Sequence, residues 1–320
     1  MKGLIFSLML LLGNQNRASA GFSDLANKTY RKHHNTITVQ IIRSSYPLDW
    51  TSSRNLLISI LKNRYWFPKT NSTLGHVTVE ANCSLGENQV RIFSGQGVKN
   101  LMNFKEKVLA GYGLSLVNSP KDYSDLPLVT VEGKLNTIDE MRAKFDLQME
   151  RDNLSLLSFQ VEQENCLNAY LFIREYIRKT DQTPLAGNKY GFGADPLKFE
   201  GAGCAPFVQA VLKKAGLDKV AMAMNQTLQV PSELLGDPKN GKIVSLFDLL
   251  STNFTLDGNG PGETRSFSFP DPERLYQFLL ESYTSNIVLE KQSLEGDESY
   301  YLLLNFRKPV LENVDSDPSV

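Results

Sequence analysis

The feature that most constrains this chain is a glycine-rich loop that leads into one cysteine and then into an amphipathic helix. The stretch Tyr190–Leu217 has the sequence YGFGADPLKFEGAGCAPFVQAVLKKAGL. Its apolar residues recur at helical spacing, which predicts a helix over residues 206–215 that ends at Gly216. Cys204 lies at the start of this helix, where backbone N–H groups favour the reactive thiolate form of a cysteine.

Two interpretations of Cys204 compete. A cysteine beside an apolar helix is often a small buried hydrophobic residue. Against this, Gly201 and Gly203 allow close backbone approach just before it, and Pro206 suits the first position of a helix. We therefore interpret Cys204 as a nucleophile, with a structural thiol as the alternative.

The three histidines, His33, His34 and His76, all precede Cys204. His76 opens a predicted strand, LGHVTVE, and an imidazole near a thiol can accept its proton. A structural histidine is the alternative there. His33 and His34 lie in a basic polar run without a nearby cysteine or carboxylate pair, which is a poor metal site. We expect no metal ion or organic cofactor.

Sequence periodicity predicts a mixture of helices and strands. The predicted strands cover residues 36–42, 76–81, 89–93 and 299–306. The predicted helices cover residues 54–65, with Ser53 as N-cap, and 103–110, 137–149, 162–179, 206–215 and 272–285. Residues 154–161 fit either type. The elements do not alternate regularly as βαβ units, so the expected fold class is α+β.

The first 20 residues have the three parts of a secretory signal peptide: Lys2, a short apolar run, and Ala18-Ser19-Ala20. Cleavage after Ala20 predicts a secreted or periplasmic protein, and a buried N-terminal helix is the alternative. Residues 21–315 are expected to form one domain with a C-terminal extension from about 230, and residues 316–320 a disordered tail. No later segment has enough apolar residues for an integral membrane helix.

Charge and cysteine content narrow the partners and the chemistry. The chain has 34 basic and 35 acidic residues and no basic stripe, so nucleic acid is not an expected partner. Its three cysteines are Cys83, Cys166 and Cys204. Outside the cytoplasm an odd count leaves a thiol free or pairs it with another chain. Cys83 and Cys166 either form a disulfide or are both buried thiols, and spacing alone leaves this open.

The two segments around Cys204 and His76 resemble the NlpC/P60 superfamily of papain-like cysteine hydrolases. In the usual members the histidine strand follows the cysteine helix. Here Gly75–Val79 matches that strand from upstream, which resembles the circularly permuted branch. The other matching residues are Tyr190, Phe192, Gly193, Pro196, Phe199, Cys204, Phe207, Val208, Gln209, Ala215, Gly216 and Leu217.

This resemblance implies a permuted papain-like core, in which the helix from Cys204 packs on an antiparallel sheet that contains the His76 strand. It also implies a cysteine hydrolase or acyltransferase that cleaves an amide or ester bond of a peptide, cell-wall or lipid substrate. Cys204 would carry the acyl group and His76 would be its base. Tyr190 and Gly203 would lie beside the oxyanion and the substrate.

The sequence departs from the family at positions that touch substrate. Family members usually have Asp before the cysteine and Ser after it, where this chain has Gly203 and Ala205. Those residues help to bind a cell-wall peptide, so the substrate stays open. A catalytically inactive binding protein of the same fold in the cell envelope is therefore the alternative function.

The residue that would orient His76 is also left open. Gln89, Arg91 and Ser94 fall on the neighbouring strand, and no motif selects one of them. Glu80 lies on the same strand as His76 at a distance of roughly 13 Å, which is too far for direct contact. We expect Glu80 to be a solvated or ion-paired surface carboxylate.

Overall fold

The computed structural model describes residues 35–44, 46–65, 75–118, 125–149, 154–182, 187–251, 254–259, 262–283 and 301–305. The predicted signal peptide, the pair His33 and His34, and the C-terminal tail lie outside these described residues. Within these ranges no helix has the length and apolar character needed to cross a membrane.

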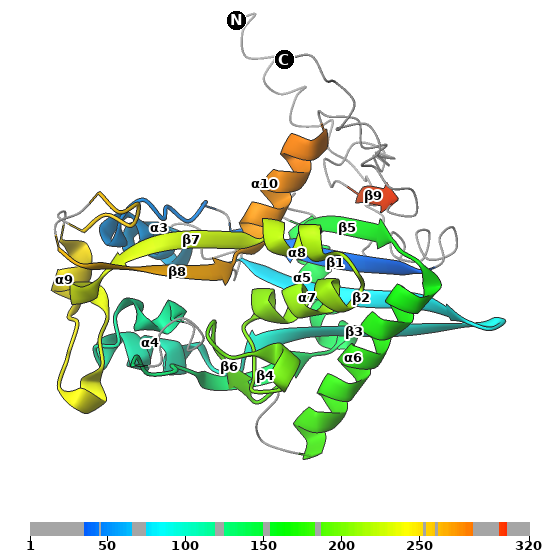
Figure 1. The fold of residues 1–320 in the computed structure, drawn as a ribbon, viewed down its shortest axis with the longest axis horizontal. Coiled ribbons are helices and arrows are strands. Elements are labelled where there is room, and N and C mark those ends of the chain that lie inside the picture. Colours follow the sequence, from blue (N-terminus) through cyan, green and yellow to red (C-terminus); the bar gives the residue numbers. More distant parts are fainter. Residues whose placement is uncertain are drawn as a thin grey trace, which may run out of the picture.

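A seven-stranded sheet runs through the centre of the protein in the order β6-β4-β3-β2-β1-β5-β9 (Figure 1). Neighbouring strands are antiparallel except β9, which is parallel to β5. The fold is therefore α+β, as predicted. The strands are β1 (Thr36–Ile42), β2 (His76–Leu85), β3 (Asn88–Val98), β4 (Val131–Asn136), β5 (Leu154–Gln160), β6 (Lys189–Tyr190) and β9 (Tyr301–Asn305).

The central strand β1 is buried along its whole length. In register, Val39 lies between Val79 of β2 and Leu157 of β5, and these residues face a common apolar core. On the opposite face the sheet is polar, and the hydroxyl groups of Thr38 and Ser158 are 2.6 Å apart in a buried hydrogen bond. Because successive strand residues point to opposite faces, the alternation in TITVQII gives one apolar and one polar face.

Two helices cover the apolar face: α6 (Gln163–Gln182) and α7 (Cys204–Lys214) (Figure 1). Their aromatic side chains meet, with the rings of Tyr176 and Phe207 4.9 Å apart in edge-to-face geometry. On the polar face, α5 (Ile138–Met149) brings Phe145 against Phe93 of β3. The helix that starts at the cysteine thus packs on the sheet that contains the histidine strand.

A second apolar core surrounds the two-stranded sheet of β7 (Asn225–Pro231) and β8 (Thr264–Pro270). Phe267 of β8 packs there with Leu56 and Leu249. The latter two come from α3 (Ser53–Tyr65) and α9 (Leu246–Leu250), near one end of the molecule in Figure 1. The other helices are α4 (Leu101–Leu109), α8 (Asp218–Ala223) and α10 (Pro272–Tyr283).

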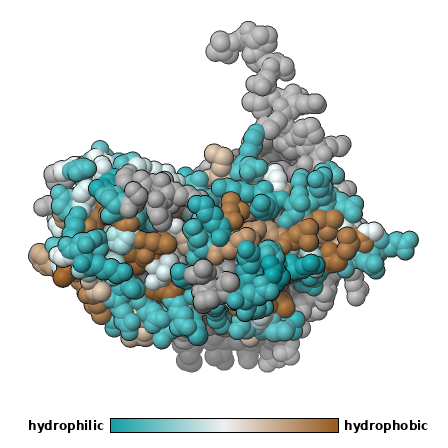
Figure 2. All heavy atoms as spheres, turned by 60° about the horizontal axis from the view of Figure 1, so that its bottom comes forward, coloured by the Kyte–Doolittle hydropathy of each residue, from teal (hydrophilic) through white to brown (hydrophobic). Residues whose placement is uncertain are grey.

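Apolar side chains also reach the surface. Figure 2 shows brown apolar patches among teal polar atoms on one face of the protein. The most exposed large apolar side chains include Phe247 of α9, at 81%, and Ile243, which precedes that helix, at 67%.

A disulfide joins Cys83 of β2 to Cys166 of α6, with their Cα atoms 5.6 Å apart. Of the two alternatives for these cysteines, the disulfide is therefore confirmed. Cys204 is left as the free thiol of the chain. The bridge fixes α6 to the strand that begins with His76.

Most predicted elements are confirmed, and residues 154–161, which fitted either type, contain strand β5. Several boundaries differ: β2 and β3 extend to Leu85 and Val98, beyond the predicted 81 and 93, and two helix starts were wrong. The N-cap of α3 is Ser52, whose Oγ accepts a hydrogen bond from the Asn55 N–H at 3.1 Å. Helix α7 begins at Cys204 itself, two residues before Pro206. Strands β4, β6, β7 and β8 were not predicted. They are short, and β4, β6 and β7 carry little apolar alternation.

Candidate functional site

Cys204 is the first residue of α7, as the site hypothesis required. Gly203 precedes it in an extended conformation, and its carbonyl accepts the Phe207 N–H at 3.1 Å, which forms the first turn. The Cys204 side chain is only 7% exposed. The thiol therefore lies at a helix start and close to the apolar core at the same time.

The glycine loop is held against β6 by backbone contacts. The Ala202 N–H donates to the Lys189 carbonyl oxygen at 3.1 Å. Gly201 has φ = +115°, and a Cβ there would lie 2.6 Å from that same oxygen. This position requires glycine on both conformational and steric grounds. The contact brings the next residue of β6, Tyr190, to the start of α7.

Three hydrogen-bond donors converge on the sulfur of Cys204. The Tyr190 hydroxyl donates to Sγ at 3.5 Å. Backbone N–H groups of Val77 and Ala205 also donate to it. Val77 directly follows His76, so the thiol lies beside the first residues of β2. Any negative charge that forms on or near this sulfur would be stabilised by these donors.

Burial nevertheless keeps the sulfur protonated. It raises the pKa of the Cys204 thiol above its usual value, although Tyr190, the two N–H groups and the charge of Lys144 act in the opposite direction. Burial likewise raises the pKa of Tyr190. The prediction that the helix start favours the thiolate is therefore outweighed, because desolvation penalises the charged form more than the donors stabilise it.

His76 is held by an amide from a different strand. Its Nε2 lies 2.8 Å from the side-chain amide nitrogen of Asn136, the last residue of β4. Burial, assisted by the positive charge of Lys144, lowers the pKa of His76 to about 3. The imidazole is thus neutral. An Asn amide can present either NH₂ or oxygen to the ring, and its orientation sets which ring nitrogen carries the proton.

The two proposed catalytic side chains are brought to the same end of β2 but not into a hydrogen bond. Cys204 contacts the backbone N–H of Val77, and the described polar contact of His76 is with Asn136. Within the described residues no hydrogen bond joins the thiol to the imidazole. Their direct pairing stays a prediction.

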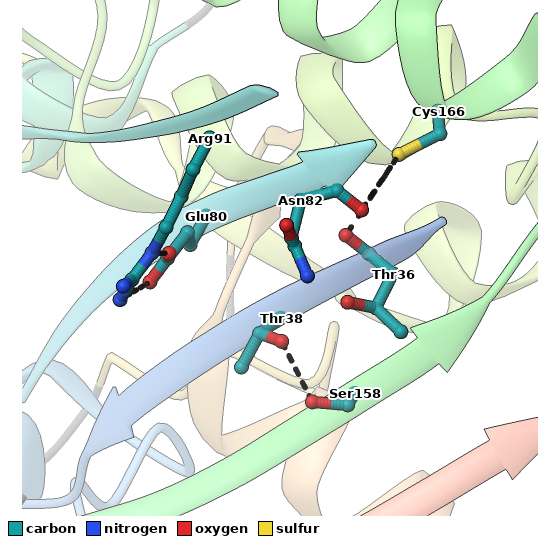
Figure 3. A network of polar contacts seen from close by, with 7 residues as sticks. All are labelled: Thr36, Thr38, Glu80, Asn82, Arg91, Ser158 and Cys166. Atoms are coloured by element: carbon teal, nitrogen blue, oxygen red, sulfur yellow. Dashed lines mark hydrogen bonds and ion pairs between the residues drawn. The ribbon is translucent and has the colours of Figure 1, made fainter. Parts of the chain in front are cut away.

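Two of the residues considered for orienting His76, Arg91 and Glu80, are bonded to each other. Figure 3 shows Arg91 reaching across to Glu80, and an Arg91 guanidinium N–H donates to Glu80 Oε2 at 3.1 Å. Glu80 is ion-paired as expected, but it is fully buried, so its placement at the surface was wrong. Ser94 lies opposite Val79, three residues beyond His76. The side chain that contacts the His76 ring is that of Asn136.

Sequence reasoning missed Asn136 and Lys144. Asn136 lies directly before Thr137, whose hydroxyl accepts the Glu140 N–H at 3.3 Å while the Glu140 carboxylate accepts the Thr137 N–H at 3.2 Å. This reciprocal pair is the signature of a capping box, so the local sequence indicates only a helix start. No local pattern marks Lys144, which lies in the middle of α5.

A cavity of about 130 Å³ lies beyond the start of β2. Its lining includes Gly75, which precedes His76, together with Trp50, Asp271 and Glu273. Burial raises the pKa of both carboxyl groups. Cys204 does not line this cavity. Among the described residues, no group of three or more His, Cys, Asp or Glu side chains could hold a metal ion.

Comparison of the chain with protein-family models, with curated proteins and with solved structures finds no match.

Proposed function

We propose that this protein is a secreted cysteine hydrolase or acyltransferase with a permuted papain-like core, which acts on an amide or ester bond through an acyl group on Cys204. The observation that carries the proposal is the convergence of three donors on a free thiol at the start of a helix. Donors that reach Sγ lie near the place where the oxygen of a carbonyl attacked by that sulfur would sit, and donors aimed there stabilise an oxyanion.

The reaction would start with the Cys204 thiol and the His76 imidazole both uncharged. The sulfur of Cys204 attacks the substrate carbonyl carbon while His76 takes the thiol proton. A carbon–sulfur bond forms, and the carbonyl oxygen becomes an oxyanion close to the Val77 and Ala205 N–H groups and the Tyr190 hydroxyl. The imidazolium then returns the proton to the leaving amine or alcohol as the bond to it breaks. Water or another acceptor removes the acyl group in a second, equivalent step.

Asn136 would orient the base. As placed, the Asn136 amide nitrogen faces Nε2. The scheme requires the flipped amide, whose oxygen accepts Nε2–H and leaves Nδ1 unprotonated to accept the thiol proton. The lowered pKa of His76 agrees with a base that is neutral before the reaction. Because Asn136 touches only the imidazole in this scheme, its role is to position the base.

The test is to trap the acyl group. The purified protein is mixed with small activated esters and thioesters, quenched in acid and analysed by peptide mass spectrometry. We expect the acyl mass on the peptide that contains Cys204, and none in the Cys204→Ala variant. Lack of acylation of the wild-type protein, or equal acylation of the variant, would sink the proposal.

A non-catalytic binding protein is the second candidate, and specific observations favour it. The thiol is protonated and lacks a hydrogen bond to His76 within the described residues. Such a protein would bind peptide, cell-wall or lipid fragments with an affinity that the Cys204→Ala change leaves intact. Binding without acylation, measured by calorimetry on both proteins, would favour this candidate.

A further inference from the structure

The cavity beyond the start of β2 is separate from the candidate thiol site. It has a volume of about 130 Å³ and is lined by residues from the end of β1, the loop before α3, the start of β7 and the first turns of α10. Neither Cys204 nor His76 lines it. A cavity of this size accommodates a molecule about as large as benzene, or one end of a longer molecule.

Two carboxyl groups line this cavity. Asp271, directly before α10, is only 8% exposed, and Glu273 is half-buried in the first turn of that helix. Asp271 Oδ1 accepts the Glu273 N–H at 3.0 Å, which caps the helix. In the described part of the chain neither carboxyl group forms an ion pair, and the Glu273 carboxylate accepts no hydrogen bond. Capping therefore accounts for one oxygen of Asp271 and for neither oxygen of Glu273.

A buried donor beside these groups is also unpaired. Trp50 lines the cavity, and its ring lies 5.0 Å from the ring of Phe269 in β8. The indole N–H is close enough to Asp271 to lower the pKa of that carboxyl, yet Nε1 is buried without a hydrogen-bond partner among the described residues. Because buried polar atoms are nearly always paired, unpaired groups around one cavity indicate that polar atoms of another molecule occupy it.

The charge of the two carboxyl groups favours a cation. Burial raises the pKa of both, and the charge of Asp271 raises that of Glu273 further. Arg274 and Arg43 act in the opposite direction. The Arg43 guanidinium, however, lies over the Tyr276 ring, 4.9 Å from its centre. A cation in the cavity would offset both the burial of the carboxylates and their mutual repulsion.

The apolar part of the lining narrows the kind of cation. It consists of Ile41, Ile42, Pro47 and Leu48, together with the Trp50 ring. Such side chains offer no oxygen ligand to a bare metal ion. The methylene groups of an alkylammonium ion, in contrast, would be removed from water against them, while its N–H groups donate to the carboxylates.

We propose that this cavity is a binding site for a primary alkylammonium group. Asp271 and Glu273 bind its charge, and Trp50 with the apolar lining binds its methylene groups. This site is independent of acyl transfer at Cys204, because that residue does not line the cavity.

The Trp50 indole N–H provides the measurement. The chain has two tryptophans, so a ¹⁵N NMR spectrum contains two indole signals, and Trp50→Phe identifies the one from the cavity. Butylammonium is titrated into the protein at about pH 7, where alkylamines are protonated. Butanol and butyrate are the neutral and anionic probes of similar length. We expect a saturable shift of the Trp50 signal with butylammonium, and affinities at least about tenfold weaker for the other two probes.

Charge-removing variants test the two carboxylates. Asp271→Asn keeps a side chain that can cap the helix, and Glu273→Gln keeps the shape of Glu273. Each should weaken the affinity for butylammonium roughly tenfold. Glu87→Gln makes the same charge change on an exposed residue in the turn after β2 and should leave the affinity unchanged. No saturable shift in the wild-type protein, equal affinity for the three probes, or unchanged affinity in both carboxyl variants would each overturn the inference.

Two further probes identify where the ammonium group comes from. Nα-acetyl-lysine amide carries it at the end of a side chain, and norleucine amide carries it at the start of a chain. Tighter binding of the first indicates a lysine side chain, and tighter binding of the second an amino terminus. If both bind more weakly than butylammonium, the site takes a free small amine. Cys204→Ala should bind butylammonium like the wild-type protein, so failure of acylation at Cys204 leaves this inference standing.

Discussion

Burial controls the charge of the individual residues around Cys204. The thiol and the Tyr190 hydroxyl both have raised pKa values, while the pKa values of His76 and Lys144 are lowered. All four shifts favour the neutral form, and desolvation is the first cause of each. A site of this kind holds its acid and its base uncharged until a reaction separates charge within it.

Protein stability should report the state of His76 as the pH falls. The pKa of His76 is about 3 in the folded protein and 6.5 in its usual state. Between these two pH values the imidazole is protonated in the unfolded chain and neutral in the folded one. Unfolding free energy should therefore fall as the pH drops from about 6.5 toward 3, by up to about 1.4 kcal/mol per pH unit from this group. The measurement is urea unfolding across this range.

The control for this prediction is His76→Gln, which keeps a polar partner for Asn136 and cannot be protonated. The stability difference between wild type and variant should shrink as the pH falls. A difference that stays constant between pH 7 and pH 4 would contradict the assigned cause.

Asn136→Ala should leave the thiol in place and weaken the base. Without the amide, the His76 ring loses the contact that sets its orientation and tautomer. We expect acylation of Cys204 by activated esters to slow by about 10²-fold or more. Asn136→Gln keeps the amide group but lengthens the side chain, so it tests whether the position of the amide matters. The assignment fails if Asn136→Ala acylates at the wild-type rate.

At the scale of elements, the candidate site is formed by residues from α7, β2, β4 and β6. Helix α7 supplies the thiol, β2 the imidazole and a backbone donor, β4 the amide and β6 the hydroxyl. The disulfide ties α6 to β2, and α6 packs beside α7 through the Tyr176 and Phe207 rings. The bridge therefore supports the site indirectly, through packing.

Reduction of the disulfide should destabilise the whole fold. The cysteines are 83 residues apart. Closing a loop of that length lowers the conformational entropy of the unfolded chain, which stabilises the folded state by about 4 kcal/mol. We expect urea unfolding with reductant to show a loss of that order. The double variant Cys83→Ala/Cys166→Ala should be equally destabilised and insensitive to reductant. A wild-type protein indifferent to reductant would refute this prediction.

At the scale of the whole molecule, residues of the same type lie both in the apolar cores and on the surface. Phe267 belongs to the core around β7 and β8 and is fully buried, whereas Phe247 of α9 is 81% exposed. The same ring therefore contributes to folding in one place and almost nothing in the other, since only apolar area removed from water stabilises the fold.

A matched pair of substitutions measures that contrast. Phe267→Ala should cost about 3–5 kcal/mol of unfolding free energy, because it removes a buried ring and leaves a cavity. Phe247→Ala should change it by less than about 0.5 kcal/mol, as is usual for exposed positions. Equal costs in thermal or urea unfolding would show that α9 is covered in solution.

The sequence by itself determined the elements whose patterns are local. The β-branched residues of Thr36–Ile42 predicted a strand, and apolar spacing with Gly216 as terminator predicted the helix after Cys204. Such patterns depend only on how successive side chains point from a helix or strand. The α+β class followed from the same local information, as did the position of the thiol at a helix start.

Only the tertiary structure decided what those elements do to one another. It paired Cys83 with Cys166, brought Asn136 to His76 and Lys144 to the thiol, and buried Cys204 until its pKa rose. Each depends on strand register or on desolvation, which arise from residues far apart in the chain. For this reason the sequence could indicate a reactive cysteine, while its partners and its charge were set by the packing around it.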